Sequence, residues 1–211
     1  PARTNIRTLH ADLPSIACIG NHEESGLLFS RYFPHPFVAN RYWSFDNGPA
    51  HFCIVDQYVD DLAWDTQMAW LEADLAATDR PWKFIVLHEP GWSAGPNANN
   101  LKVQTDIHPL CQAHDVALVL GGHNHYYARN VVDRIRHITT AGGGAPLYNP
   151  DMGYPFVVAS RAAYHFCKVE IDGGQLTFTA QTPEGFVFDT FTLELATSGV
   201  ETNEILPAGR S

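Results

Sequence analysis

Val116-Ala-Leu-Val-Leu-Gly-Gly-His-Asn-His125 is the stretch that decides the fold of this chain. Its first five residues are apolar, which is typical of a strand buried on both faces of a sheet, and a loop with two histidines follows directly. The run from Lys83 to Leu87 repeats the scheme, because His88 comes next. Buried strands that each end in a histidine-bearing loop predict a ligand site along one edge of a sheet.

The preceding part of the chain extends this pattern. Ser15–Ile19 is predicted to be a short buried strand, and it ends at Gly20-Asn21-His22-Glu23. An amphipathic helix is expected from Asp65, its N-cap, to Ala77, and a second helix over Val103–Ala113. Strands that alternate with helices indicate an α/β sheet with its ligand crevice at the strand ends.

The remaining strands are predicted from period-2 patterns and turn residues. A hairpin is expected around Asp46-Asn47-Gly48-Pro49. Its strands and those of a meander in the second half are Tyr42–Phe45, His51–Asp56, Ile135–Ala141, Ala163–Ile171, Gln175–Gln181 and Val187–Leu195. The loop from Gly142 to Pro155, rich in Gly and Pro, is expected near the crevice.

Length and composition set the class. The 211 residues suit one domain, which we assign to residues 1–196, followed by a polar tail over 197–211 without regular structure. Hydrophobic residues make up 45% and charged residues 17%, so the chain is a folded globular protein. The net charge of −10 disfavours nucleic-acid coating, and no apolar run is long enough for a membrane helix.

The four cysteines, Cys18, Cys53, Cys111 and Cys167, show no C-x-x-C pair or zinc-site spacing. Three of them lie within apolar, strand-like runs, where a thiol packs as a small hydrophobe. Buried free thiols are therefore predicted, with a disulfide between strands as the alternative.

The histidines divide by context. Asn21, His22, His88, His123 and His125 follow strands that should lie side by side, and imidazole nitrogens and an amide oxygen are ligands for Zn, Fe or Mn. Two histidines in an H-x-H segment do not easily share one metal face, so the spacing favours two adjacent ions. His51 and His165 stand in apolar runs and are expected to be structural; surface or helix positions are expected for His10, His35, His108, His114 and His137.

With these motifs, the chain resembles the calcineurin-like metallophosphoesterases, and within them the purple acid phosphatase branch. The matching segments are Gly20-Asn21-His22-Glu23, Val86-Leu87-His88, and Gly122-His123-Asn124-His125 with Tyr127 and Arg129 behind it. The resemblance covers about residues 14–195. It implies a β sandwich flanked by helices, of α/β (α+β) class, with a dinuclear metal centre at the strand ends.

The resemblance also implies an activity and its ligands. The complete enzyme would be an acid phosphatase-like hydrolase that cleaves phosphate monoesters or diesters by in-line attack of a metal-bound hydroxide. It would use two divalent or trivalent transition metal ions (Fe, Zn or Mn). Asn21, His88 and His123 would hold one ion and His125 the other.

His22 would be the catalytic residue beside the substrate phosphate, where it donates a proton to the departing alkoxide or stabilises charge. Trp92 and Tyr127 are predicted to contact the substrate, with Tyr148 and the Gly142–Pro155 loop as further candidates for lining the pocket.

One part of the family pattern does not occur here. The family's first two motifs, Asp-x-His or Asp-x-Gly and then Gly-Asp-x-x-Tyr or Gly-Asp-x-x-His, would precede Gly20, where 19 residues stand with Asp12 as the sole carboxylate. We therefore expect an N-terminally incomplete chain that lacks the first strands, leaves strand edges open and is inactive by itself. Its main partner would be the missing N-terminal segment of the same enzyme.

Three readings stay open at this point. A periplasmic or secreted location follows from the resemblance alone. A non-catalytic phosphoesterase-like subunit, which binds metal or a partner protein, is the alternative to an enzyme. A mononuclear metal-binding module built on Asn21, His88 and His123 is a third possibility.

Overall fold

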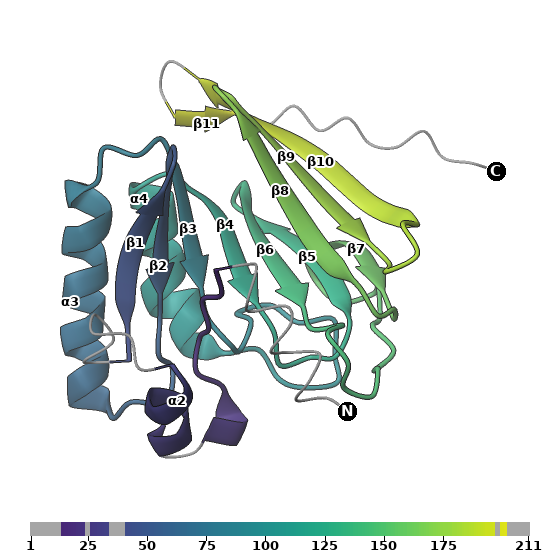
Figure 1. Ribbon diagram of the computed structural model, residues 1–211, viewed down its shortest axis with the longest axis horizontal. Helices are drawn as coiled ribbons and strands as arrows, with labels where there is room; N and C mark the ends of the chain where they lie inside the picture. Colours follow the sequence, from purple (N-terminus) through teal and green to yellow (C-terminus); the bar gives the residue numbers. More distant parts are fainter. Residues whose placement is uncertain (1–13, 24–25, 34–40, 197–198, 202–211) are drawn as a thin grey trace.

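Two β-sheets face each other, and helices cover the outer face of the larger one (Figure 1). The computed structural model describes residues 14–23, 26–33, 41–196 and 199–201. The larger sheet has the strand order β1-β2-β3-β4-β6-β5-β7, and the smaller sheet has the order β11-β10-β9-β8. The predicted sandwich with flanking helices is confirmed.

The bounds of the elements follow the chain. The larger sheet contains β1 (Trp43–Asn47), β2 (Ala50–Ile54), β3 (Trp82–Val86), β4 (Val116–Gly121), β5 (Tyr127–Val132), β6 (Ile135–Thr140) and β7 (Val157–Arg161). The smaller sheet contains β8 (Phe166–Asp172), β9 (Gln175–Gln181), β10 (Val187–Ala196) and β11 (Gly199–Glu201). The helices are η1 (Asn21–Glu23), α2 (Leu27–Tyr32), α3 (Asp61–Ala77), the π-helix η2 (Val103–Ile107) and α4 (His108–Ala113).

The centre of the larger sheet is parallel, and this places the site. β2 pairs with β3, β3 with β4, and β4 with β6, all in parallel. Helix α3 connects β2 to β3, and η2 with α4 connects β3 to β4. Because parallel strands end at one edge, the loops that follow β3 and β4 open on the same side of the sheet.

Two apolar layers hold these elements together. Leu71 and Leu75 of α3 pack with Ile85 and Val119 between the helices and the larger sheet. On the other face of that sheet, a second cluster fills the space between the sheets; it includes Phe84, Leu118, Phe178 and Leu193. The alternate residues of β3 thus serve opposite layers, as expected for a strand buried on both faces.

Helix α3 begins four residues before the expected N-cap, which is a correction. Asp60, not Asp65, caps the helix, and its carboxylate accepts a hydrogen bond from the backbone N–H of Ala63 at 2.9 Å. The first turn buries Trp64, whose indole N–H donates to Asp106 at 2.7 Å. The buried face of α3 therefore begins at Trp64, before the first residue of the apolar spacing from which the helix was predicted. The partner of Trp64, Asp106, is distant in the sequence and gave no local signal.

Four further segments differ from the expectations. Residues 14–20 form no strand, although Ile19 is buried against Trp43 and Ile54. β5 and β7 were not predicted, and Gly199–Glu201 pairs with β10 where no regular structure was expected. β5 escaped prediction because its buried face carries Arg129, whose charge is paired with Asp189 of the facing sheet at 2.9 Å.

Cys18, Cys53, Cys111 and Cys167 are free, as predicted. The predicted burial holds for Cys53 and Cys111, whereas Cys18 and Cys167 are only partly buried. Burial raises the pKa of Cys18 and of Cys167 to about 11, so these thiols stay protonated at neutral pH.

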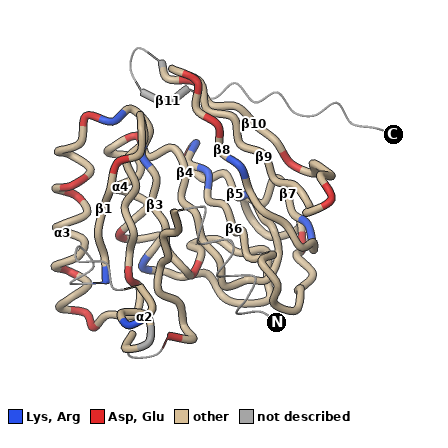
Figure 2. The backbone as a smooth tube through the Cα atoms, viewed as in Figure 1, with Lys and Arg blue, Asp and Glu red and all other residues tan. Residues whose placement is uncertain are grey.

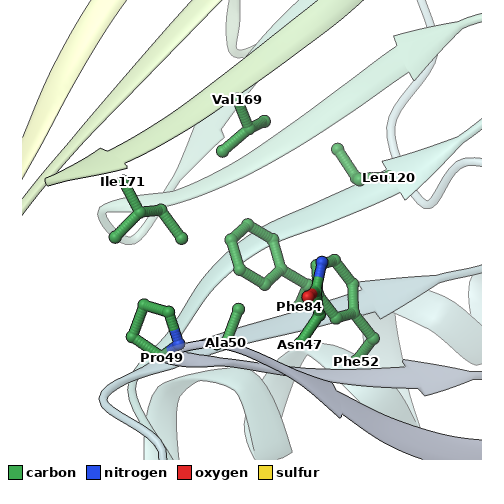
Figure 3. A pocket seen from close by; sticks show the side chains of 9 residues that line it. Asn47, Pro49, Ala50, Phe52, Phe84, Leu120, Val169 and Ile171 are labelled. Atoms are coloured by element: carbon green, nitrogen blue, oxygen red, sulfur yellow. The ribbon is translucent and has the colours of Figure 1, made fainter.

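Among the described residues, one side of the sandwich is uncovered, beside a cavity between the two sheets (Figure 3). Within the described part of the chain, β8 pairs with β9 only. Val169 and Ile171 of β8 face Phe52, Phe84 and Leu120 of the larger sheet across a cavity of about 290 Å³. Val169 remains 36% exposed although it lies opposite the buried Phe178 in the register. An inward-facing valine with that exposure marks an uncovered edge of the core.

Candidate metal centre

The five residues predicted from the strand-end loops line one pocket of about 470 Å³. They come from η1 and from the loops after β3 and β4, and they are Asn21, His22, His88, His123 and His125. Asn97, Gly122, Ala141 and Tyr148 complete the lining. The structure therefore brings together predicted residues up to 104 positions apart. The parallel pairing of β3 and β4 accounts for the shared position of the loops that carry His88, His123 and His125.

Gln57, which the sequence did not single out, positions His88. Its side-chain oxygen accepts hydrogen bonds from the backbone N–H groups of His88 at 2.9 Å and Glu89 at 2.6 Å. The carbonyl of His88 in turn accepts from the N–H of Gly122 at 2.8 Å. These bonds tie the loops after β2, β3 and β4 to one another.

The imidazole of His88 faces Asn21 directly. Its Nε2 lies 2.9 Å from the side-chain oxygen of Asn21. Gly20 allows this approach, because a Cβ built there would lie 2.8 Å from Nδ1 and Cε1 of His88. A nitrogen and an oxygen at this separation can serve as neighbouring ligands of one ion.

His123 is the second imidazole at this point. Its ring centroid lies 5.2 Å from that of His88, in an edge-to-face arrangement. The backbone of His123 is left-handed, with a φ of 63°, which the sharp turn after β4 imposes. Burial, and then the charge of His123, lowers the pKa of His88, so its imidazole is neutral and able to bind a metal at neutral pH.

His125 lies across the pocket. Its Nδ1 is 2.9 Å from the carbonyl oxygen of Pro146, and its ring stacks on Tyr148 with centroids 4.4 Å apart. Donation from Nδ1–H to that carbonyl leaves Nε2 with its lone pair, which is the usual state of a metal-binding histidine. Tyr148, from the Gly142–Pro155 loop, thus contributes to the pocket as expected.

Two predicted substrate residues lie elsewhere, and both are corrections. Tyr127 is fully buried between the sheets, where its hydroxyl donates to Asp189 at 2.5 Å. Trp92 packs edge-on against His137, with centroids 4.6 Å apart, and against His108. Both side chains are held by partners distant in the sequence, so neither lines the strand-end pocket.

One of the unassigned histidines requires a correction. His137 is buried on β6 and is neither a surface nor a helix residue, whereas His108 begins α4 as expected of a helix position, although it is buried as well. His108 Nδ1 lies 3.1 Å from His137 Nε2. His51 and His165 are buried as expected of structural residues, and His114 lies at the end of α4. His10 and His35 lie outside the described residues.

The donor chemistry of the pocket fits transition metals. Imidazole nitrogens and an amide oxygen suit Zn, Fe or Mn. All these donors are neutral, and the described residues that line the pocket include no carboxylate. A cation bound here would keep its full positive charge, so a complete centre for two cations needs anionic ligands in addition.

Comparison with known proteins agrees with this chemistry. The family model of the calcineurin-like phosphoesterases matches residues 3–127, which is more than half of the chain. The chain therefore belongs to the calcineurin-like phosphoesterase family, a family of metal-dependent phosphoesterases with dinuclear metal centres.

Individual relatives refine the placement. The chain is 31% identical to purple acid phosphatase 23 of Arabidopsis thaliana over 68% of this chain and 34% of that protein. The purple acid phosphatase PPD1 of yellow lupin has the same fold, with a TM-score of 0.58 at 20% identity over 80% of this chain and 37% of that one. GAP50 of Plasmodium, described as the anchor in the inner membrane complex, gives a TM-score of 0.63 at 17% identity over 74% of this chain and 55% of that one.

The chain thus spans about a third of the length of the curated purple acid phosphatase that it matches. Within the described residues, no helix is long and apolar enough to cross a membrane.

Proposed function

We propose that this chain carries the histidine-rich half of a metal-dependent phosphoesterase that hydrolyses phosphate monoesters or diesters. Asn21, His88 and His123 would hold one metal ion, and His125 the other. The observation that supports this is the convergence of neutral nitrogen and oxygen donors on one pocket in a chain of this family. Fe, Zn and Mn all suit the donor set.

The proposal gives Asn21 and His88 a metal-binding role and His22 a role beside the substrate phosphate. Two cations held by these residues would supply positive charge to neutralise phosphate oxygens and to acidify a water molecule. The side-chain oxygen of Asn21 and Nε2 of His88 lie 2.9 Å apart, so these two atoms would be neighbouring ligands of one ion. His22 is exposed at the pocket, where its imidazole can give a proton to the leaving alkoxide or stabilise charge on the phosphate.

The proposal includes a second segment of polypeptide. The described pocket lining contains no carboxylate, and no other described strand pairs with the outer edge of β8, which lies beside an apolar cavity. Strands contributed by a preceding N-terminal segment of the same enzyme would supply anionic ligands and cover this edge. The 211 residues by themselves would then be inactive. An exported enzyme, periplasmic or secreted, is part of the same proposal.

The direct test compares this chain with the longer natural polypeptide that contains it. We expect the longer protein to bind close to two transition metal ions and to hydrolyse p-nitrophenyl phosphate, and the 211-residue chain to show neither property in full. Metal content is measured by elemental analysis. Rapid hydrolysis by the purified 211-residue chain would refute the requirement for a second segment. Less than one tightly bound metal in the longer protein would refute the phosphoesterase proposal.

The role of His22 is tested in the longer protein with His22→Ala. General acid catalysis by a histidine contributes about 10²- to 10⁴-fold, so we expect a loss in kcat of that order while metal content persists. His114→Ala, which changes a histidine outside the pocket, is the matched control and should leave both quantities unchanged. Equal loss of metal and activity in His22→Ala would make His22 a ligand instead.

A non-catalytic subunit is the second candidate. The fold shared with GAP50, described as an anchor, and the neutral lining of the described pocket both favour it. A longer protein that binds metal at His88 and His123 but hydrolyses neither monoesters nor diesters would support this candidate.

A further inference from the structure

A second group of metal-binding side chains lies away from the strand-end pocket. His51 and Cys53 are two residues apart on β2, so both side chains lie on the same face of the sheet, and Asp74 of α3 meets them there. Their ligand atoms all lie within 4.8 Å of one another. None of the three lines the strand-end pocket.

The separations approach those of a tetrahedral zinc site. His51 Nε2 is 2.9 Å from Asp74 Oδ2, and Cys53 Sγ is 3.4 Å from the same oxygen. Zinc bond lengths place nitrogen and oxygen ligands about 3.3 Å apart, and sulfur and oxygen ligands about 3.5 Å apart. These two pairs need to open by only a few tenths of an ångström to admit an ion, and the ligand atoms of the third pair, His51 and Cys53, lie within 4.8 Å of each other.

The surroundings of His51 are those of an oriented metal ligand. Its Nδ1 is 2.7 Å from a carboxylate oxygen of Asp46, which fixes the ring. A carboxylate behind a ligating histidine holds the tautomer with a free Nε2 and raises the basicity of the ring. Ser44 donates a hydrogen bond to the other oxygen of Asp74 at 2.9 Å, so that carboxylate is also held in place.

The hydrogen-bond count calls for a cation at Nε2. A neutral imidazole has one N–H, and its donation to Asp46 leaves the Nε2 lone pair facing a carboxylate oxygen at 2.9 Å. Two lone pairs at this distance repel each other, so either a proton or a metal ion must lie between them. Helix α3, which supplies Asp74, bears Asp and Glu and no Lys or Arg (Figure 2), so its charge attracts cations.

We infer that His51, Cys53 and Asp74 form a mononuclear site for Zn²⁺ that is separate from the proposed phosphoesterase centre. The thiolate and imidazole select a borderline-soft ion over Mg²⁺ or Ca²⁺. Binding converts the thiol to a thiolate and, where His51 is protonated, releases the Nε2 proton as well. A water molecule would be the fourth ligand, and Asp74, whose side chain is 21% exposed, is the most accessible of the three residues. The ion ties β2 to α3.

Cobalt(II) titration of the 211-residue chain tests this site, because cobalt bonded to a cysteine sulfur produces a thiolate-to-metal charge-transfer band in the near ultraviolet. The strand-end pocket has no cysteine among its described lining residues. We expect the band to appear at one equivalent of cobalt, to disappear on addition of one equivalent of Zn²⁺, and to be absent in Cys53→Ser.

Three further variants make the result specific. Cys111→Ser removes a buried free thiol outside the cluster, and His123→Ala alters the strand-end pocket; both should keep the band. Asp74→Asn retains the side-chain shape on a partly exposed helix position and should weaken cobalt binding at least tenfold. It serves as the second probe should Cys53→Ser fail to fold.

The outcomes are decisive in both directions. Absence of the band in the unmodified chain, or its persistence in Cys53→Ser, would overturn the inference and leave a protonated His51 between two carboxylates. Failure of the phosphoesterase proposal is a separate result, since it is measured by hydrolysis in the longer protein and by loss of metal from variants at the strand ends.

Discussion

The strand-end pocket and the His51 cluster use the same residue type on the same sheet in opposite ways. At the strand ends, His88 and His123 line an open pocket, and their ring contacts are with each other, with Tyr58 and with the neutral Asn21. His51 is 5% exposed, and both of its ring nitrogens lie against carboxylates. The difference follows from position, because a loop after a strand opens to solvent and a strand interior beneath a helix does not.

The largest expected effect is a difference in the free energy of unfolding between a variant of the His51 cluster and a variant of the strand-end pocket. In the metal-free chain, His51→Ala leaves Asp46 and Asp74 without a shared donor and opens a void, so unfolding should become easier by about 2–3 kcal/mol. His125→Ala, at the pocket, should change the free energy of unfolding by less than about 1 kcal/mol. Urea denaturation of both variants measures the difference. Equal destabilisation would show that His125 is as structural as His51.

The pH dependence of stability should depend on the buried histidine pair His108 and His137, which belongs to neither group. Burial, and then the neighbouring His108, lowers the pKa of His137 to about 3. The unfolded chain binds this proton near pH 6.5, so the contribution of neutral His137 is complete above that pH and is lost as the pH falls toward about 3. Linkage gives a loss of about 2 kcal/mol between pH 7 and pH 5 from this residue.

The measurement is the free energy of unfolding at several pH values, with His137→Gln for comparison. The variant should be less stable at pH 7 and show a flatter acid slope. An unchanged slope would assign the acid sensitivity to other groups.

The smallest effect tests the close approach at the strand ends. A Cβ at Gly20 would lie 2.8 Å from the ring of His88, so Gly20→Ala should displace that imidazole and destabilise the fold by about 1 kcal/mol. Gly143→Ala is the matched control, since nothing lies within 4 Å of its Cβ position. Thermal unfolding and the ring NMR signals of His88 measure the outcome. Unchanged His88 signals in Gly20→Ala would contradict the packing that the structure shows.

The residues of the candidate site, and those assigned to it from the sequence, differed in how well the sequence predicted their positions. His88, His123 and His125 were predictable because the apolar segments before them mark strand ends, whereas the strand predicted before Asn21 does not form. Tyr127 was misassigned to the substrate pocket, since its partner Asp189 lies 62 residues away on the facing sheet. Gln57 gave no local signal, because its role consists of hydrogen bonds to the backbone of a different loop.

The fold shows the same division. The sequence specified the apolar strand cores of β3 and β4, the hairpin turn and the end of α3, because these depend on local periodicity and turn residues. β5 was hidden by the buried charge of Arg129, which is stable only because Asp189 is beside it.

By itself, the sequence determined that His88, His123 and His125 follow buried strands, and hence that they meet at one edge of a sheet. It also predicted a strand before Asn21, where the structure has none. Only the tertiary structure decided which histidines face an open pocket, which are enclosed, and that His51 and Cys53 meet Asp74. The physical reason is that a strand-end loop is specified by neighbouring residues, whereas burial and ionic partners depend on which distant elements pack together.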